Sequence, residues 1–413
     1  MTAMRIVWHE IRRILLDWVL WVMVAVSLVV NGWQIWSGSY NRDSYVVFED
    51  TVEIIGNELT AKSLDCLEEL YTQEVDTAKD RYLDQMGTEA ENLLQLYQRG
   101  CLEDDEDSFQ RLQLWQKIIS AKETLLGEGT VYSAEAFIES RENLFPTQVE
   151  ALEARVTQIQ ENKESHYLSV ATFTDLWQTL YGVLLPLLYA ELTVIAVYLV
   201  LKNTELEFAL GTHSIVFVTR KGRKIQISRL WGCIVAVTLV FVLLSGITLM
   251  AYMAVYPQSS ALDAPVAAQV YPSMIPKFNL TGLAYLLLNL AAGYGVVLVF
   301  VLLAGSVGIL LHNSYLGFVA VAGVAGVMAV MQQACQDQMV LSDLLLAWNP
   351  LSLIATITDS WEIVPRTGDL FLYTVDCYSA PLFEIGVLTV WLCIGIAAYV
   401  VSYRLFGRKE ISA

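Results

Sequence analysis

The sequence predicts an all-α polytopic membrane protein: six transmembrane helices, an N-terminal amphipathic helix and a mostly helical domain outside the membrane. Three observations lead to this fold class. Hydrophobic residues make up 55% of the 413 residues and charged residues only 16%, below the roughly 25% typical of soluble domains. Six apolar stretches approach the ~20 residues that cross a bilayer. Lys and Arg also gather in alternate connections between these stretches, as the positive-inside rule predicts.

We expect the chain to begin with an amphipathic elbow helix, residues 1–13, on the inner membrane surface. Its arginines lie away from one apolar helical face, which is formed by Val7, Trp8, Ile11 and Leu15. A first span over residues 14–36 follows. A cleaved signal peptide is an alternative, since two arginines precede an apolar core. Tryptophans at both ends of that core favour a retained anchor.

Residues 37–175 are acidic, and we expect them to form a helical extracytoplasmic domain. From residue 42 to 175 there are 11 Lys and Arg and 29 Asp and Glu, which accounts for the net charge of −18. This charge would attract cationic ligands such as basic peptides, and solubility explains it equally well. Apolar residues recur there at helical spacing: Leu64, Leu67, Tyr71, Val75, Ala78, Tyr82 and Met86, then Val149, Leu152, Val156 and Ile159.

Breaks between these helices are expected at residues 99–107, at residues 127–130 and at Pro146, with Asp107 capping the helix after the first break. The acidic run at residues 103–107 lacks the alternating ligands, central Gly and distal Glu of a calcium loop, so a solvated turn is the better interpretation.

No metal or redox motif is present in the sequence, because the six cysteines form no CxxC pair and the four histidines are scattered. On an oxidising side of the membrane, Cys66 could pair with Cys101, and Cys335 with Cys377. Ordinary free thiols are an equal alternative.

Five further spans are expected after the outer domain, at residues 176–201, 230–256, 280–311, 315–334 and 380–405. The loop at residues 202–229 carries six Lys and Arg, whereas the outer segments at residues 257–279 and 335–379 carry only Lys277 and Arg366. The positive-inside rule therefore places the loop, the N-terminus and the tail at residues 406–413 in the cytoplasm, and residues 37–175 outside the plasma membrane. Re-entrant or short helices are expected within residues 335–379.

Polar residues inside the predicted spans are candidates for a translocation pathway, because intramembrane acids are costly and usually face a bundle interior or a water-filled path. These candidates are Glu191, Asn289 and Glu384. Pro186 is expected to kink the second span. Two small-xxx-small pairs, Ala304 with Gly308 and Ala322 with Gly326, are typical of close helix packing.

The inner loop carries a recognisable order of residues. Glu207 is followed four residues later by Gly211 and Thr212, and then by Thr219 and a basic stretch; farther on, Asn349 and Pro350 precede the last span. With the elbow helix and six spans, this order resembles the ABC-2-type exporter permeases, whose second span runs into a coupling helix with a Glu-x-x-x-Gly-Thr pattern. The Asn-Pro step is similar to one in their re-entrant outer helices. The large outer domain departs from many members of the family.

The resemblance implies a dimeric channel, built from two copies of this chain or from this chain and a similar permease, and surrounded by membrane lipid. The channel would export a peptide, a lipid or another amphiphile. Cytoplasmic ABC ATPase subunits would bind ATP and Mg²⁺, since this chain has no GxxxxGK[ST] loop. We therefore expect the chain itself to be no enzyme and to bind no cofactor, metal or nucleic acid. The ATPase-coupling residues implied are Glu205, Glu207, Gly211, Thr212, Thr219, Arg220, Lys221, Arg223 and Lys224.

Other functions fit the sequence less well. A membrane sensor would bind a ligand with the outer domain and signal through the basic loop, which the orientation rule alone would also make basic. Two spans would suffice for that function. An ion-coupled transporter would usually show internal repeats, and none is evident. A membrane enzyme would need a catalytic constellation across spans, which is not apparent.

Overall fold

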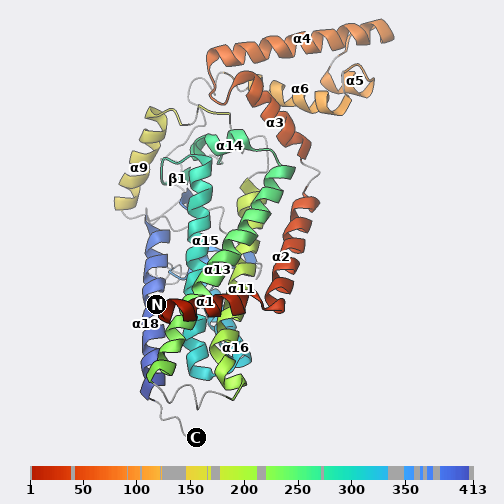
Figure 1. Ribbon diagram of the computed structural model, residues 1–413. Coiled ribbons are helices and arrows are strands. Elements are labelled where there is room, and N and C mark those ends of the chain that lie inside the picture. The colour runs from red at the N-terminus through yellow and green to blue at the C-terminus, as the bar shows by residue number, and fades with distance from the viewer. Residues whose placement is uncertain are drawn as a thin grey trace.

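The computed structural model describes residues 2–38, 42–90, 92–102, 105–120, 122, 146–164, 166–168, 177–211, 220–270, 274–333, 348–357, 363–365, 370–374 and 382–408. It is mostly helical, and five helical segments in these ranges are long and apolar enough to cross a membrane. They run roughly side by side in one bundle, with an arm of further helices at one end (Figure 1). The five segments are Trp18–Ser37, Thr179–Leu206, Ile225–Val255, Gly282–Leu311 and Phe383–Phe406.

The corresponding helices are α2 (Trp18–Ser37), α11 (Leu185–Ala209), α13 (Arg220–Val255), α15 (Gly282–Leu311) and α18 (Phe383–Arg408). The predicted fifth span corresponds to α16 (Ser314–Gln333), whose apolar stretch, Ser314–Val330, is shorter than the other five. The helix preceding α11, Trp177–Leu184, is π-helical and lies just before Pro186, which lacks an N–H and disfavours a regular α-helical turn on its N-terminal side.

Helix α15 lies at the centre of the bundle and approaches its neighbours closely through glycines. A Cβ atom on Gly293 would lie 2.4 Å from the Tyr189 ring of α11, and one on Gly308 would lie 3.1 Å from Thr204. Ala304 is fully buried, so the predicted close packing at Ala304 and Gly308 is confirmed. The other small pair, Ala322 with Gly326 on α16, is exposed and packs against nothing in the described part of the chain.

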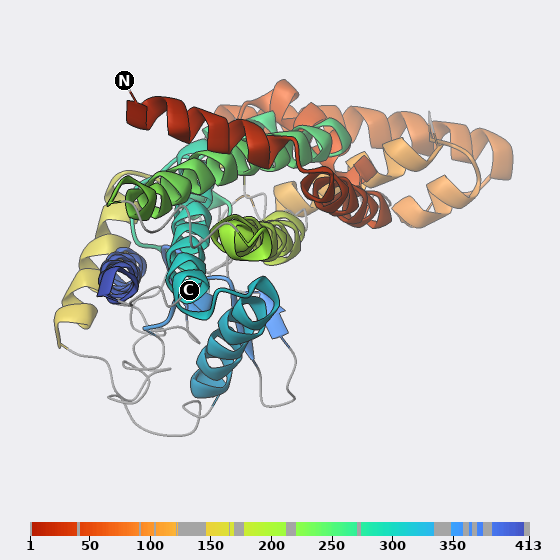
Figure 2. The same ribbon diagram turned by 60° about the horizontal axis from the view of Figure 1, so that its bottom comes forward.

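Helix α1 (Thr2–Leu15) lies across the bundle along the N-terminal part of α13, as both views show (Figures 1 and 2). The chain turns before α2, where the Asp17 side chain accepts a hydrogen bond from the Val19 amide at 3.3 Å and caps the helix. The first apolar helix therefore starts at Trp18, and the predicted start at Ile14 is wrong because Ile14 belongs to α1 and is buried.

The predicted inner loop at residues 202–229 is largely helical. Helix α11 continues to Ala209, and Gly211 follows with a φ of +68°, a backbone conformation that suits glycine. Helix α13 starts at Arg220, ten residues before the predicted third span, and its 36 residues extend over about 54 Å. The connection between the two helices is therefore short.

The domain that the sequence predicts to lie outside the membrane, called the outer domain below, contains α3 (Arg42–Ile55), α4 (Ala61–Met86), α5 (Leu93–Gln98), α6 (Asp105–Ser120) and α9 (Pro146–Glu161). Helices α3 to α6 form the lateral arm in Figure 1. The predicted helical runs are confirmed, since Leu64, Leu67, Val75, Leu152 and Ile159 are buried. Asp107 is not a cap, because α6 already starts at Asp105. The break expected at residues 127–130 lies outside the described residues.

Short elements lie at the end of the bundle next to this domain, called its outer end below: α14 (Ser259–Asp263), β1 (Met274–Pro276), β2 (Ala355–Ile357), β3 (Ile363–Pro365) and β4 (Leu372–Thr374). Strand β1 pairs antiparallel with β4, and β2 with β3. The described parts of the segment predicted to hold re-entrant or short helices thus contain three strands and a 3-10 turn, Pro350–Leu353. The fold is mostly helical rather than purely α.

Candidate functional site

The basic loop is the first predicted site. Glu205 Oε2 accepts a hydrogen bond from the Ser314 amide at 2.6 Å and so caps the start of α16, while the residue stays partly exposed. Gly211 ends α11 in the left-handed conformation. The remaining coupling residues are not described in full: Glu207, Arg220, Lys221, Arg223 and Lys224 have helical backbones but undescribed side chains, and Thr212 and Thr219 lie outside the described residues.

A buried polar cluster joins α1 to the N-terminal part of α13, close to this loop. Glu10 is 5% exposed and Arg229 is 2% exposed, with 3.9 Å between Glu10 Oε1 and Arg229 Nε. Arg13 pairs with Glu10 and donates a hydrogen bond to Asn203 of α11. A Cβ on Gly232 would lie 2.9 Å from the Glu10 Cβ, so only glycine permits this approach. In the sequence, the arginines of this cluster indicate only membrane orientation, and nothing indicates that Glu10 pairs with them.

Glu191, the first pathway candidate, belongs to a polar cluster inside the spanning helices. Asn31 Nδ2 of α2 donates hydrogen bonds to Glu191 Oε2 at 3.1 Å and to Thr248 Oγ1 of α13 at 3.4 Å. Ser27, one turn before Asn31 on α2, is buried beside this cluster. Three helices therefore contribute to one cluster around a half-buried acid. The expectation that Glu191 faces other spans is consistent with this geometry.

Asn289, the second candidate, is completely buried in α15, and its Nδ2 donates to the Tyr285 carbonyl of the same helix at 3.0 Å. No hydrogen bond among the described residues joins it to Glu191 or Glu384. The structure therefore does not bring the three candidates into one site.

Glu384, the third candidate, is part of a buried ion pair at the outer end of the bundle. Its Oε1 accepts from Lys277 Nζ at 2.8 Å and from the Phe371 amide at 3.0 Å, and the two charged side chains are 5% and 0% exposed. Lys277 also lies 5.6 Å from the centre of the Tyr373 ring. Burial raises the pKa of the Tyr373 hydroxyl, and the Glu384 charge raises it further. Glu384 thus connects α18 to β1 and β4.

A second buried ion pair contacts the end of strand β1 and the residues after it. Arg155 of α9 pairs with Glu164 at 2.6 Å, and both side chains are about 95% buried. Its guanidinium also donates to the carbonyls of Pro276 at 2.8 Å and Phe278 at 3.3 Å. The segment from Pro276 to Phe278 is therefore bound to the outer domain through its carbonyls and to α18 through Lys277. Nothing in the sequence predicts this linkage.

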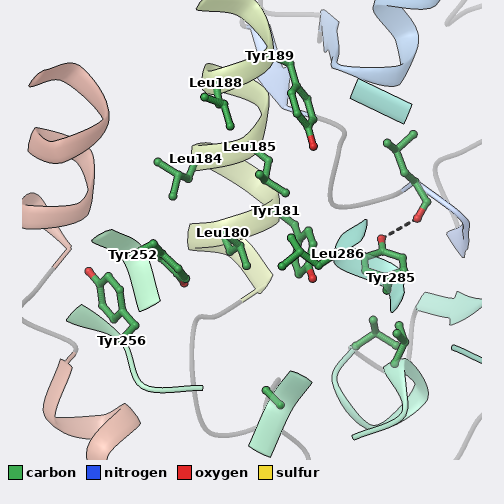
Figure 3. Close-up of a cluster of buried hydrophobic side chains, with 14 of the residues drawn as sticks. Leu180, Tyr181, Leu184, Leu185, Leu188, Tyr189, Tyr252, Tyr256, Tyr285 and Leu286 are labelled. Atoms are coloured by element: carbon green, nitrogen blue, oxygen red, sulfur yellow. Dashed lines mark hydrogen bonds between the residues drawn. The ribbon is translucent and has the colours of Figure 1, made fainter. Parts of the chain in front are cut away.

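A group of tyrosines joins the outer domain to the top of the bundle. Tyr45 of α3 packs edge-on against Tyr256 of α13, with ring centres 5.0 Å apart, and its hydroxyl lies 3.4 Å from Thr179. Tyr252 and Tyr256 lie on one side of Leu180 and Tyr181, and Tyr285 lies on the other (Figure 3). The Tyr285 hydroxyl donates to the Leu370 carbonyl at 2.6 Å. The outer ends of α11, α13 and α15 are thereby fixed together.

A further attachment lies at α14. Glu49 of α3 accepts hydrogen bonds from the Ser260 amide at 3.0 Å and the Ser260 hydroxyl at 2.9 Å, and Asn57 donates to the Ser260 carbonyl at 2.8 Å. The arm of the outer domain is therefore bound to the segment that joins α13 to α15.

Of the two alternatives left open for Cys66 and Cys101, a disulfide or free thiols, the structure shows free thiols. Cys66 is exposed on α4, and Cys101 is buried with its Sγ 3.6 Å from Gln85 Oε1. Cys335 and Cys377 lie outside the described residues. No group of His, Cys, Asp and Glu suited to a metal ion occurs in the part of the chain that the structure describes.

Comparison of the chain with models of protein families, with curated proteins and with solved structures found no match. We therefore infer function from the chain's own residues.

Proposed function

We propose that this chain is the transmembrane permease subunit of an ATP-driven ABC exporter of the ABC-2 type. In this proposal a separate cytoplasmic ATPase binds ATP and Mg²⁺, and the channel is a dimer with a second copy or a similar permease. The exported molecule is a peptide, a lipid or another amphiphile.

The exposed tryptophans of α2 support a membrane position for the bundle. Trp18 and Trp21 lie near one end and Trp33 and Trp36 near the other, all between 46% and 73% exposed. The outermost two, Trp18 and Trp36, are 18 residues or about 27 Å of helix apart, close to the ~30 Å between the two edges of the hydrocarbon core where aromatic belts lie. Helix α1 crosses the bundle near the Trp18 end and exposes Trp8, as an elbow helix at the inner interface would. In this arrangement α16 is a sixth span.

The observation that carries the proposal is the link between α11 and α13. Here a Glu-x-x-x-Gly-Thr sequence, Glu207 to Thr212, precedes the basic run Arg220 to Lys224. Both helices reach this link directly from the membrane, so a force on the link would act on two spans at once. Helix α1 is bound to the same end of α13 through Glu10 and Arg229. An energy-coupling partner would bind here and move three helices together.

Affinity purification of the full chain from its native host, followed by mass spectrometry, tests this proposal. We expect an ABC ATPase to co-purify with the wild type. Its recovery should fall strongly with Glu207→Arg combined with Arg223→Glu, because both charges of the link are reversed. Glu69→Arg combined with Lys79→Glu on exposed α4 makes the same charge changes outside and should retain the ATPase.

Three outcomes would contradict the proposal in part or whole. If no ATPase is recovered with the wild type, the exporter function is wrong. If a kinase or other regulator is recovered instead, a sensor function replaces it. If the ATPase is retained equally by both double variants, it docks elsewhere than on the α11–α13 link.

A further inference from the structure

The polar cluster of Asn31, Glu191 and Thr248 is unusual because it lies inside apolar helices from three parts of the chain. Asn31 is 1% exposed and Thr248 is 2% exposed. A carboxyl group within a span is expensive and is usually paired or functional. Here no Lys or Arg pairs with Glu191 in the described part of the chain, and Asn31 donates a hydrogen bond to its carboxyl group.

The cluster also contains an acceptor that lacks a partner. Asn31 uses its Nδ2 for both hydrogen bonds, and among the described residues its buried Oδ1 accepts none. The buried Ser245 hydroxyl, one turn before Thr248 on α13, likewise has no hydrogen-bond partner in the described part of the chain. An unsatisfied polar atom in hydrocarbon costs several kcal/mol, so these buried oxygens beside an acid are suited to bind a polar or charged group.

We propose that Asn31, Glu191 and Thr248 form a membrane-embedded binding site for a monovalent cationic group. Rotation of the Asn31 amide by 180° exchanges Nδ2 for Oδ1, which turns a third oxygen toward the carboxylate and the Thr248 hydroxyl. The Asn31 amide nitrogen, which donates to both Glu191 and Thr248, lies at the position that the cationic group would take.

Charge balance sets the class of ligand. One carboxylate neutralises one positive charge, whereas a divalent cation would leave a net positive charge in a medium of low dielectric constant. Oxygen ligands suit both a hard metal ion such as Na⁺ and the N–H donors of a primary ammonium group. The ammonium group would belong to an amphiphile that enters between the helices. The binding itself does not depend on the proposed export function.

The test is a binding measurement on the full chain in lipid nanodiscs, read as the ligand-dependent rise of its unfolding temperature. One arm compares NaCl with choline chloride at equal ionic strength. The other compares decylammonium with decyltrimethylammonium, which carries the same charge and chain but no N–H donor. We expect a saturable rise with Na⁺ or with decylammonium, larger than with its matched control.

Variants test whether the rise of the unfolding temperature comes from binding at this cluster. Glu191→Gln removes the charge and Thr248→Val removes an oxygen at nearly constant shape, and each should weaken binding by about tenfold or more. Thr193→Val is the matched control for Thr248→Val, because the Thr193 hydroxyl donates a hydrogen bond to the Tyr189 carbonyl of its own helix. A response to Na⁺ alone identifies a metal ion, and a response to decylammonium alone identifies an amine. Equal responses to each ligand and its control, or an unchanged response in Glu191→Gln and Thr248→Val, would overturn the proposal.

Discussion

Lys277 and Glu384 form an ion pair that water hardly reaches, so its two charges depend on each other. Lys277→Met would leave a buried carboxylate with no counter-charge, and we expect it to lower the free energy of unfolding by about 3–5 kcal/mol. Adding Glu384→Gln should recover more than half of this loss. The neutral amide needs no counter-charge, and its oxygen can still accept from the Phe371 amide.

Unfolding titrations in SDS, followed by tryptophan fluorescence, would measure these differences. Arg111→Met is the matched control, because Arg111 and Glu74 pair at 3.1 Å while about a third of each side chain is exposed. Its loss should stay below about 1 kcal/mol. If the Lys277→Met/Glu384→Gln variant were less stable than Lys277→Met alone, the burial of the pair would not be the source of the effect.

Single residues were the hardest part of this chain to predict from sequence. Glu384 is expected in a pathway because it is an acid near a span, but its partner Lys277 lies 107 residues away in a connecting segment. Glu205 is expected to contact an ATPase, and the sequence gives no sign of its hydrogen bond to the Ser314 amide, 109 residues away. Hydrophobic patterns carry no information about such distant pairs. Glu191 is correctly singled out as a polar residue inside a span, whereas its contact with Asn31 comes only from the fold.

At the scale of helices, the packing of α11 on α15 depends on Gly293. Gly293→Ala would place a methyl group against the Tyr189 ring, and we expect a loss of about 1–3 kcal/mol as the two helices separate. Gly246→Ala on α13 is the matched control, since nothing lies within 4 Å of the added methyl group. There the better helix propensity of Ala should leave stability equal or raise it by up to about 1 kcal/mol. Unfolding titrations of both variants check this, and equal effects would refute the packing argument.

The helices themselves were largely predictable, because long apolar runs and 3.6-residue periodicity are strong signals. Their ends were not. Helix α13 starts ten residues before the predicted third span, since Arg220 to Arg229 contains no helix breaker except Gly222 and packs near α1. The strands were missed because three residues are too few to show a period of two.

At the scale of the whole molecule, the outer domain is joined to the bundle at several separate points. Glu49 and Asn57 bind α14, Tyr45 packs on α13, and Arg155 holds the segment after β1. Lys277 continues the last of these contacts to α18. A ligand that moved the arm or α9 would therefore act on the outer ends of several spans together. In the proposed exporter, these contacts would let a movement of the outer domain change the positions of the helices that form the channel.

That proposal requires the outer domain and the α11–α13 link to lie on opposite sides of the membrane, and single cysteines can test this. Cys66 is exposed on α4, and Leu210 is 65% exposed at the end of α11. In spheroplasts, a charged maleimide that does not cross membranes should label Cys66 when the other cysteines are replaced by Ser. The same reagent should label Leu210→Cys, made in a chain without other cysteines, only after the membrane is permeabilised, because the basic residues beside it favour the cytoplasmic side. Labelling of both positions from outside would place the link and the arm on one side of the membrane, and would exclude docking of a cytoplasmic ATPase on that link.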